Sequence, residues 1–154
     1  MEFGLVAVWW VLYVGVGLLA VPAASLVFSS FSDRGAGLAI PLAFGVLAFS
    51  GFWIGHVTFG LETALLSVGV LVLLSGMALW KGVEMQFSRY GDTVVVFSLA
   101  FLFLLGIRVV KPGVWPGGGE KFLDFGLLAS LLRGSHLPPE DFWFANEPIQ
   151  YYYG

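Results

Sequence analysis

The side chains best suited to chemistry lie in the last third of the chain, after its long apolar segments. Glu120 and Asp124 are four residues apart in a segment that we predict to be a short helix, so both carboxylates lie on one face of it. A carboxylate at a membrane surface can act as a general base on a hydroxyl group. It can also simply solvate the start of the helix, with Lys121 pairing to Asp124. Both interpretations stay open on the residues alone.

Two cations lie in the same segment. Lys121 follows Glu120 directly, and Arg133 lies at the expected end of the helix, before Gly134. A guanidinium can bind a phosphate group through two parallel hydrogen bonds, or it can complement the partial negative charge at a helix C-terminus. We therefore consider Lys121 and Arg133 as candidate substrate-binding residues, with a purely structural role as the alternative.

The segment after this helix combines prolines, acids and aromatic rings. It reads Pro138-Pro139-Glu140-Asp141-Phe142-Trp143 and ends on Tyr151, Tyr152 and Tyr153. The carboxylates can be solvated in a rigid turn, and the rings can form an interfacial aromatic belt or the wall of a substrate site. The candidate substrate-binding residues of this segment are Asp141, Trp143, Tyr151, Tyr152 and Tyr153.

Two other kinds of site find little support. Gly117-Gly118-Gly119-Glu120-Lys121-Phe122 fails the phosphate-binding loop pattern, because the lysine lacks a preceding glycine and a following serine or threonine. His136 has no second histidine and no cysteine nearby, so we predict no metal-ligand set. The cofactor is unknown at this point, and a divalent metal is left open.

Composition indicates a membrane protein. The chain is 58% hydrophobic and 11% charged, whereas soluble domains carry roughly 25% charged residues. A net charge of −3 without a cluster of lysines and arginines argues against a nucleic-acid partner. Zero cysteines exclude disulfides and thiolate metal sites. Membrane lipid is the expected surrounding.

We predict an all-α integral membrane fold with about four transmembrane helices, a surface loop and a short amphipathic helix. Each apolar run approaches or exceeds the roughly 20 residues that a bilayer core requires. Pro22 should kink the first helix rather than end it, and residues 81–92 should form a solvated loop. The predicted regions are 1–111, the transmembrane part, and 112–154, the polar and aromatic surface loop. The first predicted span lies within the uncharged run 3–32, and the others are 36–59, 63–80 and 93–110.

The short helix predicted at residues 120–133 is apolar almost all round, so it must lie on the membrane or be buried under other loops. Lysines and arginines are distributed about equally over the loops expected on the two sides of the membrane. The positive-inside rule therefore does not predict the orientation of the chain. The abrupt end after three tyrosines predicts that further helices of a longer chain complete the protein.

The residues support a resemblance to a known family. Gly118-Gly119-Glu120-Lys121-Phe122-Leu123-Asp124, the segment from Leu137 to Ala145, and the tyrosine triplet resemble the archaeal and Chloroflexi "YYY" polytopic membrane proteins. The segments Asp33 to Leu42 and Trp53 to His56 are similar to haloarchaeal members. The resemblance implies a multi-pass protein of the cell membrane and covers most of the chain.

A second resemblance concerns function. An acid after a span, a short helix, a Gly-Ser turn, prolines and an aromatic pair are similar to the first external loop of GT-C glycosyltransferases. The resemblance implies transfer of sugar from a polyprenyl-phosphate carrier, with the loop on the extracytoplasmic side. It makes Asp124 the general base, with Glu120 second. Many such enzymes carry a second acid where this chain has Phe125.

Three classes of function remain: a glycosyltransferase, a non-catalytic scaffold or assembly protein, and, ranked last, a transporter. A transferase predicts that Asp124 and Arg133 share one cavity. A scaffold predicts that they are separated by more than about two helical turns and face opposite ways.

Overall fold

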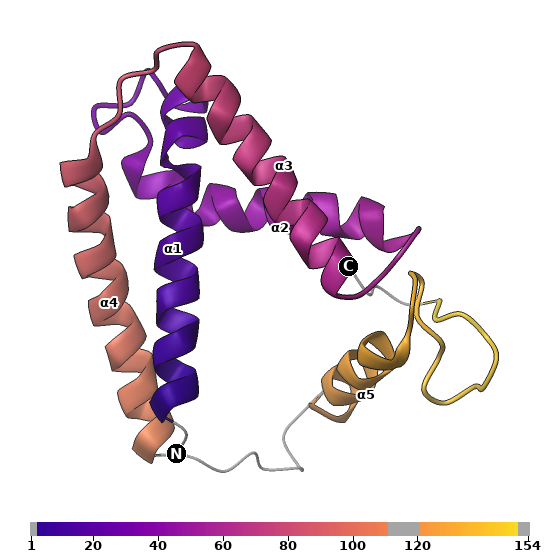
Figure 1. The fold of residues 1–154 in the computed structure, drawn as a ribbon. Coiled ribbons are helices and arrows are strands. Elements are labelled where there is room, and N and C mark those ends of the chain that lie inside the picture. The colour runs from indigo at the N-terminus through magenta and orange to yellow at the C-terminus, as the bar shows by residue number, and fades with distance from the viewer. Residues whose placement is uncertain (1–2, 111–120, 151–154) are drawn as a thin grey trace. The chain divides into compact units, whose positions relative to one another are not determined.

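The computed structural model describes residues 3–110 and 121–150. These residues form five α-helices and one short 3-10 helix, η1 (Figure 1). The order along the chain is α1 (Phe3–Val27), η1 (Ala36–Leu38), α2 (Ala39–Gly55), α3 (Leu61–Trp80), α4 (Phe87–Val110) and α5 (Lys121–Arg133).

Four of the helical segments are long and apolar enough to cross a membrane. They are Phe3–Val27, Ala36–Gly55, Leu61–Trp80 and Phe87–Val110. The chain is therefore an all-α integral membrane protein with several spans, which confirms the predicted fold class. Pro22 lies inside α1 without ending it, as predicted.

The chain divides into two compact units, which are described separately. Unit 1 comprises Met1–Leu47 and Gly69–Pro112, and unit 2 comprises Ala48–Val68 and Gly113–Gly154. Each of α2 and α3 contributes one part to each unit. The division at residues 111 and 112, between a membrane region and a surface region, stays a prediction.

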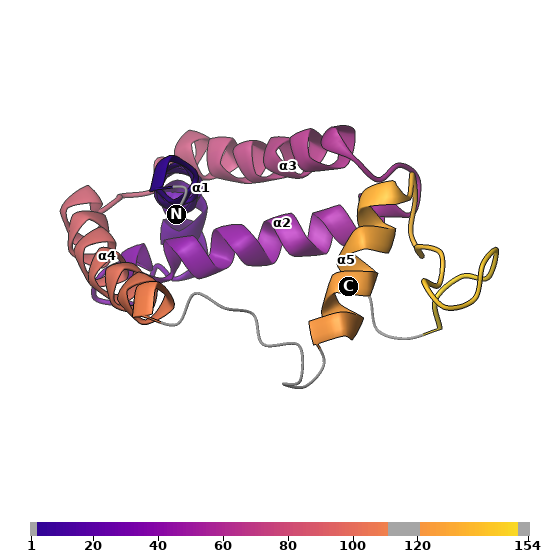
Figure 2. The ribbon, with the colours of Figure 1, turned by 90° about the horizontal axis from the view of Figure 1, so that it is seen from below.

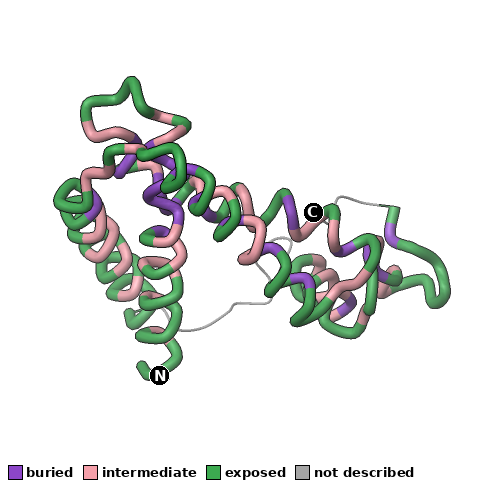
Figure 3. Tube along the Cα trace, turned by 45° about the horizontal axis from the view of Figure 1, so that its top comes forward, coloured by how far each residue is buried: buried purple, intermediate pink, exposed green. Residues whose placement is uncertain are grey.

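The core of unit 1 is made by small side chains. Fully buried alanines of α1, η1 and α2 let these backbones approach closely, as is usual between membrane helices (Figure 3). Gly17 of α1 is the tightest point, because a Cβ there would lie 2.4 Å from Ile40 Cγ1 and 2.6 Å from Tyr90 Oη. The buried alanines are Ala20, Ala24, Ala36, Ala39 and Ala43.

Two loops of unit 1 lie together at one end of α1 and α4. Arg34 Nη2 lies 2.7 Å from Glu84 Oε2. Gln86 Nε2 donates to the Ser32 carbonyl at 3.4 Å. The loop after α1 and the loop before α4 are thus on one side of the unit, and Figure 2 views α1 along its axis from the opposite end.

The fourth span begins earlier than predicted. The charges of residues 81–92 predicted a solvated loop, but α4 begins at Phe87. Tyr90 is 4% exposed and its hydroxyl donates to the Val14 carbonyl of α1 at 2.5 Å. Arg89 and Asp92 are exposed on the helix surface and pair with each other, so their charges do not oppose helix formation.

In unit 2, the turn after α2 is tied to the segment after α5. Span two ends at Gly55 rather than at the predicted Phe59, because the Phe59 N–H donates to the Ser135 carbonyl at 2.7 Å. The Leu137 N–H donates to the Gly55 carbonyl, also at 2.7 Å. Leu137 is 7% exposed and packs on Gly55, so this contact anchors the last described segment.

Candidate functional site

Helix α5 carries the first of the candidate residues. It begins at Lys121 and ends at Arg133, and the Gly134 N–H closes its last turn on the Ser130 carbonyl at 3.0 Å. Asp124 lies in its first turn. Four other predicted site residues lie outside the described residues: Glu120, Tyr151, Tyr152 and Tyr153. The side chain of Lys121 is also outside them, so the roles of all five stay predictions.

The segment after α5 folds into a closed loop. Glu140 and Pro148 form an isolated antiparallel bridge. The Asp141 N–H donates to the Glu147 carbonyl at 2.8 Å, and the Ile149 N–H donates to the Pro139 carbonyl at 3.0 Å. Pro139 and Ile149 are both buried. The loop therefore has its own hydrogen-bonded base, which restrains the side chains it carries.

Each acid of the loop uses one oxygen atom to hold the backbone. Asp141 Oδ1 accepts the Trp143 N–H at 2.7 Å and the Phe144 N–H at 3.2 Å. Glu140 Oε1 accepts the Asn146 N–H at 2.6 Å. The second oxygen of each carboxylate is not used in these bonds, so it can still accept a hydrogen bond from a ligand.

Two contacts dock the loop on α5. The Ser130 hydroxyl donates to the Glu140 carbonyl. The Phe142 ring lies directly on Gly126, where a Cβ would come within 2.6 to 3.0 Å of three ring carbons. A glycine at this place is what lets the ring approach the helix backbone.

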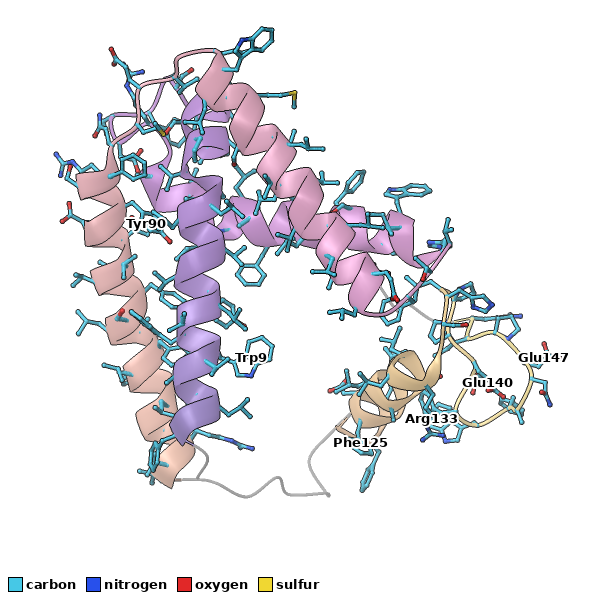
Figure 4. The ribbon with its side chains drawn as sticks, in the orientation of Figure 1. Trp9, Tyr90, Phe125, Arg133, Glu140 and Glu147 are labelled. Carbon is cyan, nitrogen blue, oxygen red and sulfur yellow. The ribbon has the colours of Figure 1, made fainter. Side chains whose placement is uncertain are left out.

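The docked loop and the end of α5 enclose a hollow of about 340 Å³. It brings together three predicted binding residues, Arg133, Asp141 and Trp143. Figure 4 shows Arg133 beside the loop that carries Glu140, whereas Phe125 points away from that loop. Arg133 makes no ion pair or hydrogen bond with another described residue. The remaining lining residues are Ser130, Gly134, Glu140, Phe142 and Ala145.

Asp124 does not line this hollow. It is nine positions before Arg133 on a continuous helix, which corresponds to about two and a half turns and roughly 13.5 Å along the axis. Half a turn of difference puts the two side chains on opposite faces. Asp124 is exposed. The predicted base and the predicted cation therefore do not share one cavity on this helix.

The exposed face of α5 is apolar. Gly126 and Ser130 lie on the face that the loop covers. Four large apolar side chains that the loop leaves uncovered are more than half exposed, which is the pattern of a helix that lies on a membrane or against another chain segment. They are Phe122, Phe125, Leu128 and Leu132.

Comparison with known proteins gives a family. Residues 46–154, most of the chain, match the family described as "Uncharacterized membrane protein (DUF2298)". This chain belongs to the DUF2298 family. The search of curated proteins and that of solved structures found no match.

The region matched by the DUF2298 family contains α3, α4, α5 and the docked loop with its hollow. Family and helices together establish a multi-pass membrane protein surrounded by lipid. Within residues 3–110 and 121–150, no group of three or more histidines, aspartates and glutamates is arranged to hold a metal ion.

Glu140 lines the hollow but is not among the binding residues predicted from the sequence. Of the two adjacent acids, only Asp141 is a predicted binding residue, and solvation in a proline turn is the alternative for both. The only local signal is the pair of adjacent acids after Pro138-Pro139. The bond from Ser130 to the Glu140 carbonyl joins residues ten positions apart, and no periodic pattern encodes it.

Proposed function

We propose that this protein is a glycosyltransferase that uses a lipid-linked sugar, and that the hollow beside α5 binds a sugar or phosphate group of the acceptor, away from the bond that reacts. The observation that carries the proposal is the convergence of a guanidinium, two carboxylates and an indole on one hollow, from Arg133, Glu140, Asp141 and Trp143. The loop resemblance to GT-C glycosyltransferases points to the same chemistry.

Each group in the hollow suits a different part of a sugar phosphate. Arg133 can bind phosphate oxygens through two parallel hydrogen bonds. The remaining oxygens of Glu140 and Asp141 can accept hydrogen bonds from sugar hydroxyls. Trp143 is 68% exposed, so its ring is available to stack on the C–H face of a sugar.

The proposed reaction needs a base and a cation. The carboxylate of Asp124 takes the proton of the acceptor hydroxyl as that oxygen forms a bond to the anomeric carbon. The bond between the anomeric carbon and the lipid phosphate breaks, and the phosphate leaves with the electron pair. Lys121 is three residues before Asp124 and is the nearest cation in sequence to steady the phosphate. Arg133 lies on the other face of α5, roughly 13.5 Å along the axis from Asp124, so it binds a part of the acceptor away from the reacting hydroxyl.

A transfer assay tests this proposal. The full-length protein is reconstituted in liposomes with a labelled polyprenyl-phosphate sugar and acceptor. We expect Asp124→Asn to lower the transfer rate about 100-fold or more, as loss of a general base does. Arg133→Gln should mainly raise the acceptor concentration needed for half-maximal rate. Glu147→Gln is the matched control, because this exposed acid of the same loop does not line the hollow.

A non-catalytic scaffold is the second candidate. The separation of Asp124 and Arg133 on α5 favours it, as do the backbone bonds that occupy one oxygen of each loop acid. In that case the wild-type protein transfers no sugar, and Asp124→Asn has no effect in the transfer assay. Disruption of the docked loop then reduces co-purification of partner proteins. Normal transfer by the Asp124→Asn protein would instead remove Asp124 from the catalytic role.

A further inference from the structure

Unit 1 has a groove of its own, of about 560 Å³, beside the start of α4. One end is charged and the other is apolar. The charged end carries Asp33, Arg89 and Asp92. The apolar end is lined by Ile40, Pro41, Val96 and Phe97.

The charged end is held in place by the backbone. Asp33 Oδ1 accepts the Gly35 N–H at 3.0 Å, and Oδ2 accepts the Gly37 N–H at 2.8 Å. Arg89 Nη1 lies 3.6 Å from Asp92 Oδ2, and both side chains are well exposed, at 63% and 73%. This ion pair is long and solvated, so the guanidinium has donors left for another group.

The lining of the groove changes from charged to apolar at one level along α4. Arg89 and Asp92 are the last charges before Arg108, and the residues between them, from Thr93 to Ile107, are uncharged. The groove therefore crosses the level where water gives way to hydrocarbon. A ligand that fills both ends must have a charged head and an apolar tail.

We propose that this groove binds a zwitterionic phospholipid whose headgroup carries a primary ammonium. Its phosphate pairs with Arg89, its ammonium donates to Asp33 and Asp92, and one hydrocarbon chain lies along Val96 and Phe97. Two carboxylates against one guanidinium give this end a net charge of −1, which disfavours an anionic lipid. A choline headgroup has no N–H to donate to the carboxylates.

Native mass spectrometry of the full-length protein in detergent tests the proposal. The protein is titrated with phosphatidylethanolamine, phosphatidylcholine and phosphatidylglycerol of identical acyl chains. We expect ethanolamine lipid to be retained best. Arg89→Gln and Asp92→Asn should each lower its retention roughly two- to fivefold, the range expected for solvated charge pairs.

Two matched controls separate the groove from the surface. Lys81→Gln removes the same charge as Arg89→Gln from an exposed residue that does not line the groove, and it should leave retention unchanged. Val96→Trp fills the apolar end without changing charge and should lower retention. Val95→Trp places the same ring at an exposed neighbour that does not line the groove.

Equal retention of the three lipids would overturn the proposal. So would a loss in the Lys81→Gln protein as large as that in Arg89→Gln, because the effect would then be one of general surface charge. Equal losses in Val95→Trp and Val96→Trp would also contradict it. None of these outcomes depends on sugar transfer. Evidence against the lipid site would therefore leave the proposed transferase activity untouched, and the reverse also holds.

Discussion

Two buried serines of unit 1 differ in how their hydroxyl groups are satisfied. Ser75 of α3 donates to the Leu19 carbonyl of α1 at 2.7 Å. Ser25 of α1 is fully buried, and its hydroxyl has no hydrogen-bond partner among the described residues. A buried polar group without a partner destabilises the folded state, whereas a hydrogen bond between two helices stabilises it.

Substitution of these serines by alanine should therefore have opposite effects. Ser75→Ala should lower the free energy of unfolding by about 0.5 to 1.5 kcal/mol. Ser25→Ala should leave it unchanged or raise it. Thermal unfolding of both variants in one detergent measures the difference. An equal loss in the two variants would contradict this account of Ser25.

Gly126 decides whether the loop can dock on α5. In Gly126→Ala the new methyl group meets the Phe142 ring at 2.6 to 3.0 Å, so we expect a cost of about 1 to 3 kcal/mol and release of the loop. Limited proteolysis after α5 should become faster. Gly106→Ala on α4 is the control, since nothing lies within 4 Å of a Cβ there. Unchanged proteolysis of the Gly126→Ala protein would show that the ring adapts.

At the scale of elements, the turn between α1 and η1 depends on one carboxylate. The N–H groups of Gly37 and Gly35 lower the pKa of Asp33 below its ordinary value of 3.8, and Arg89 adds to the effect. A depressed pKa in the folded state means that Asp33 contributes stability above pH 3.8, and that this contribution is lost as the pH falls through the lowered value.

Asp33→Asn should remove this pH-dependent contribution. The difference in melting temperature between wild type and variant should be largest near neutral pH and should shrink as the pH falls below about 4. The melts are recorded in detergent without added lipid from pH 7 to pH 3. A difference that stays constant over this range would show that the Asp33 carboxylate does not stabilise the turn.

The crossing of α1, α2 and α4 depends on the absence of a side chain at Gly17. Gly17→Ala should destabilise the protein by about 1 to 3 kcal/mol, because its methyl group overlaps Ile40 and the Tyr90 hydroxyl. Gly15→Ala, two residues earlier in α1, has open space around a Cβ and should be neutral or stabilising. Thermal unfolding compares the pair. Similar melting temperatures would mean that the three helices separate easily.

At the scale of the whole molecule, four crossings predict the side of each loop. In unit 1 the loops around Arg34 and Glu84 contact each other. In unit 2 the turn at Phe59 contacts Ser135. Each contact joins segments that an even number of crossings separates, so each pair should lie on one side of the membrane.

Cysteine labelling measures this arrangement directly, because the chain has no cysteine of its own. Ser32→Cys and Lys81→Cys should react with a membrane-impermeant thiol reagent from one side. Val57→Cys and Ser135→Cys should react from the other. Labelling of Ser32→Cys and Val57→Cys from the same side would show that the second segment does not cross the bilayer.

The sequence by itself determined the membrane spans and the end of α5. A run of some 20 apolar side chains must be helical in lipid whatever its neighbours are, because its backbone has no water to bond. Gly134 ends α5 through a local bond to Ser130, which also needs no distant partner. These are properties of composition and of near neighbours in the chain.

Only the tertiary structure decided which charged residues meet. Arg133 joins Glu140 and Asp141 because Phe142 packs on Gly126 and the loop closes between Glu140 and Pro148. Asp33 and Arg89 line one groove because α1, η1 and α4 pack together. Likewise, α4 gains its first turns from the burial of Tyr90 against α1. Such contacts join distant residues and depend on turn geometry and close packing, which the local pattern of residue types does not encode.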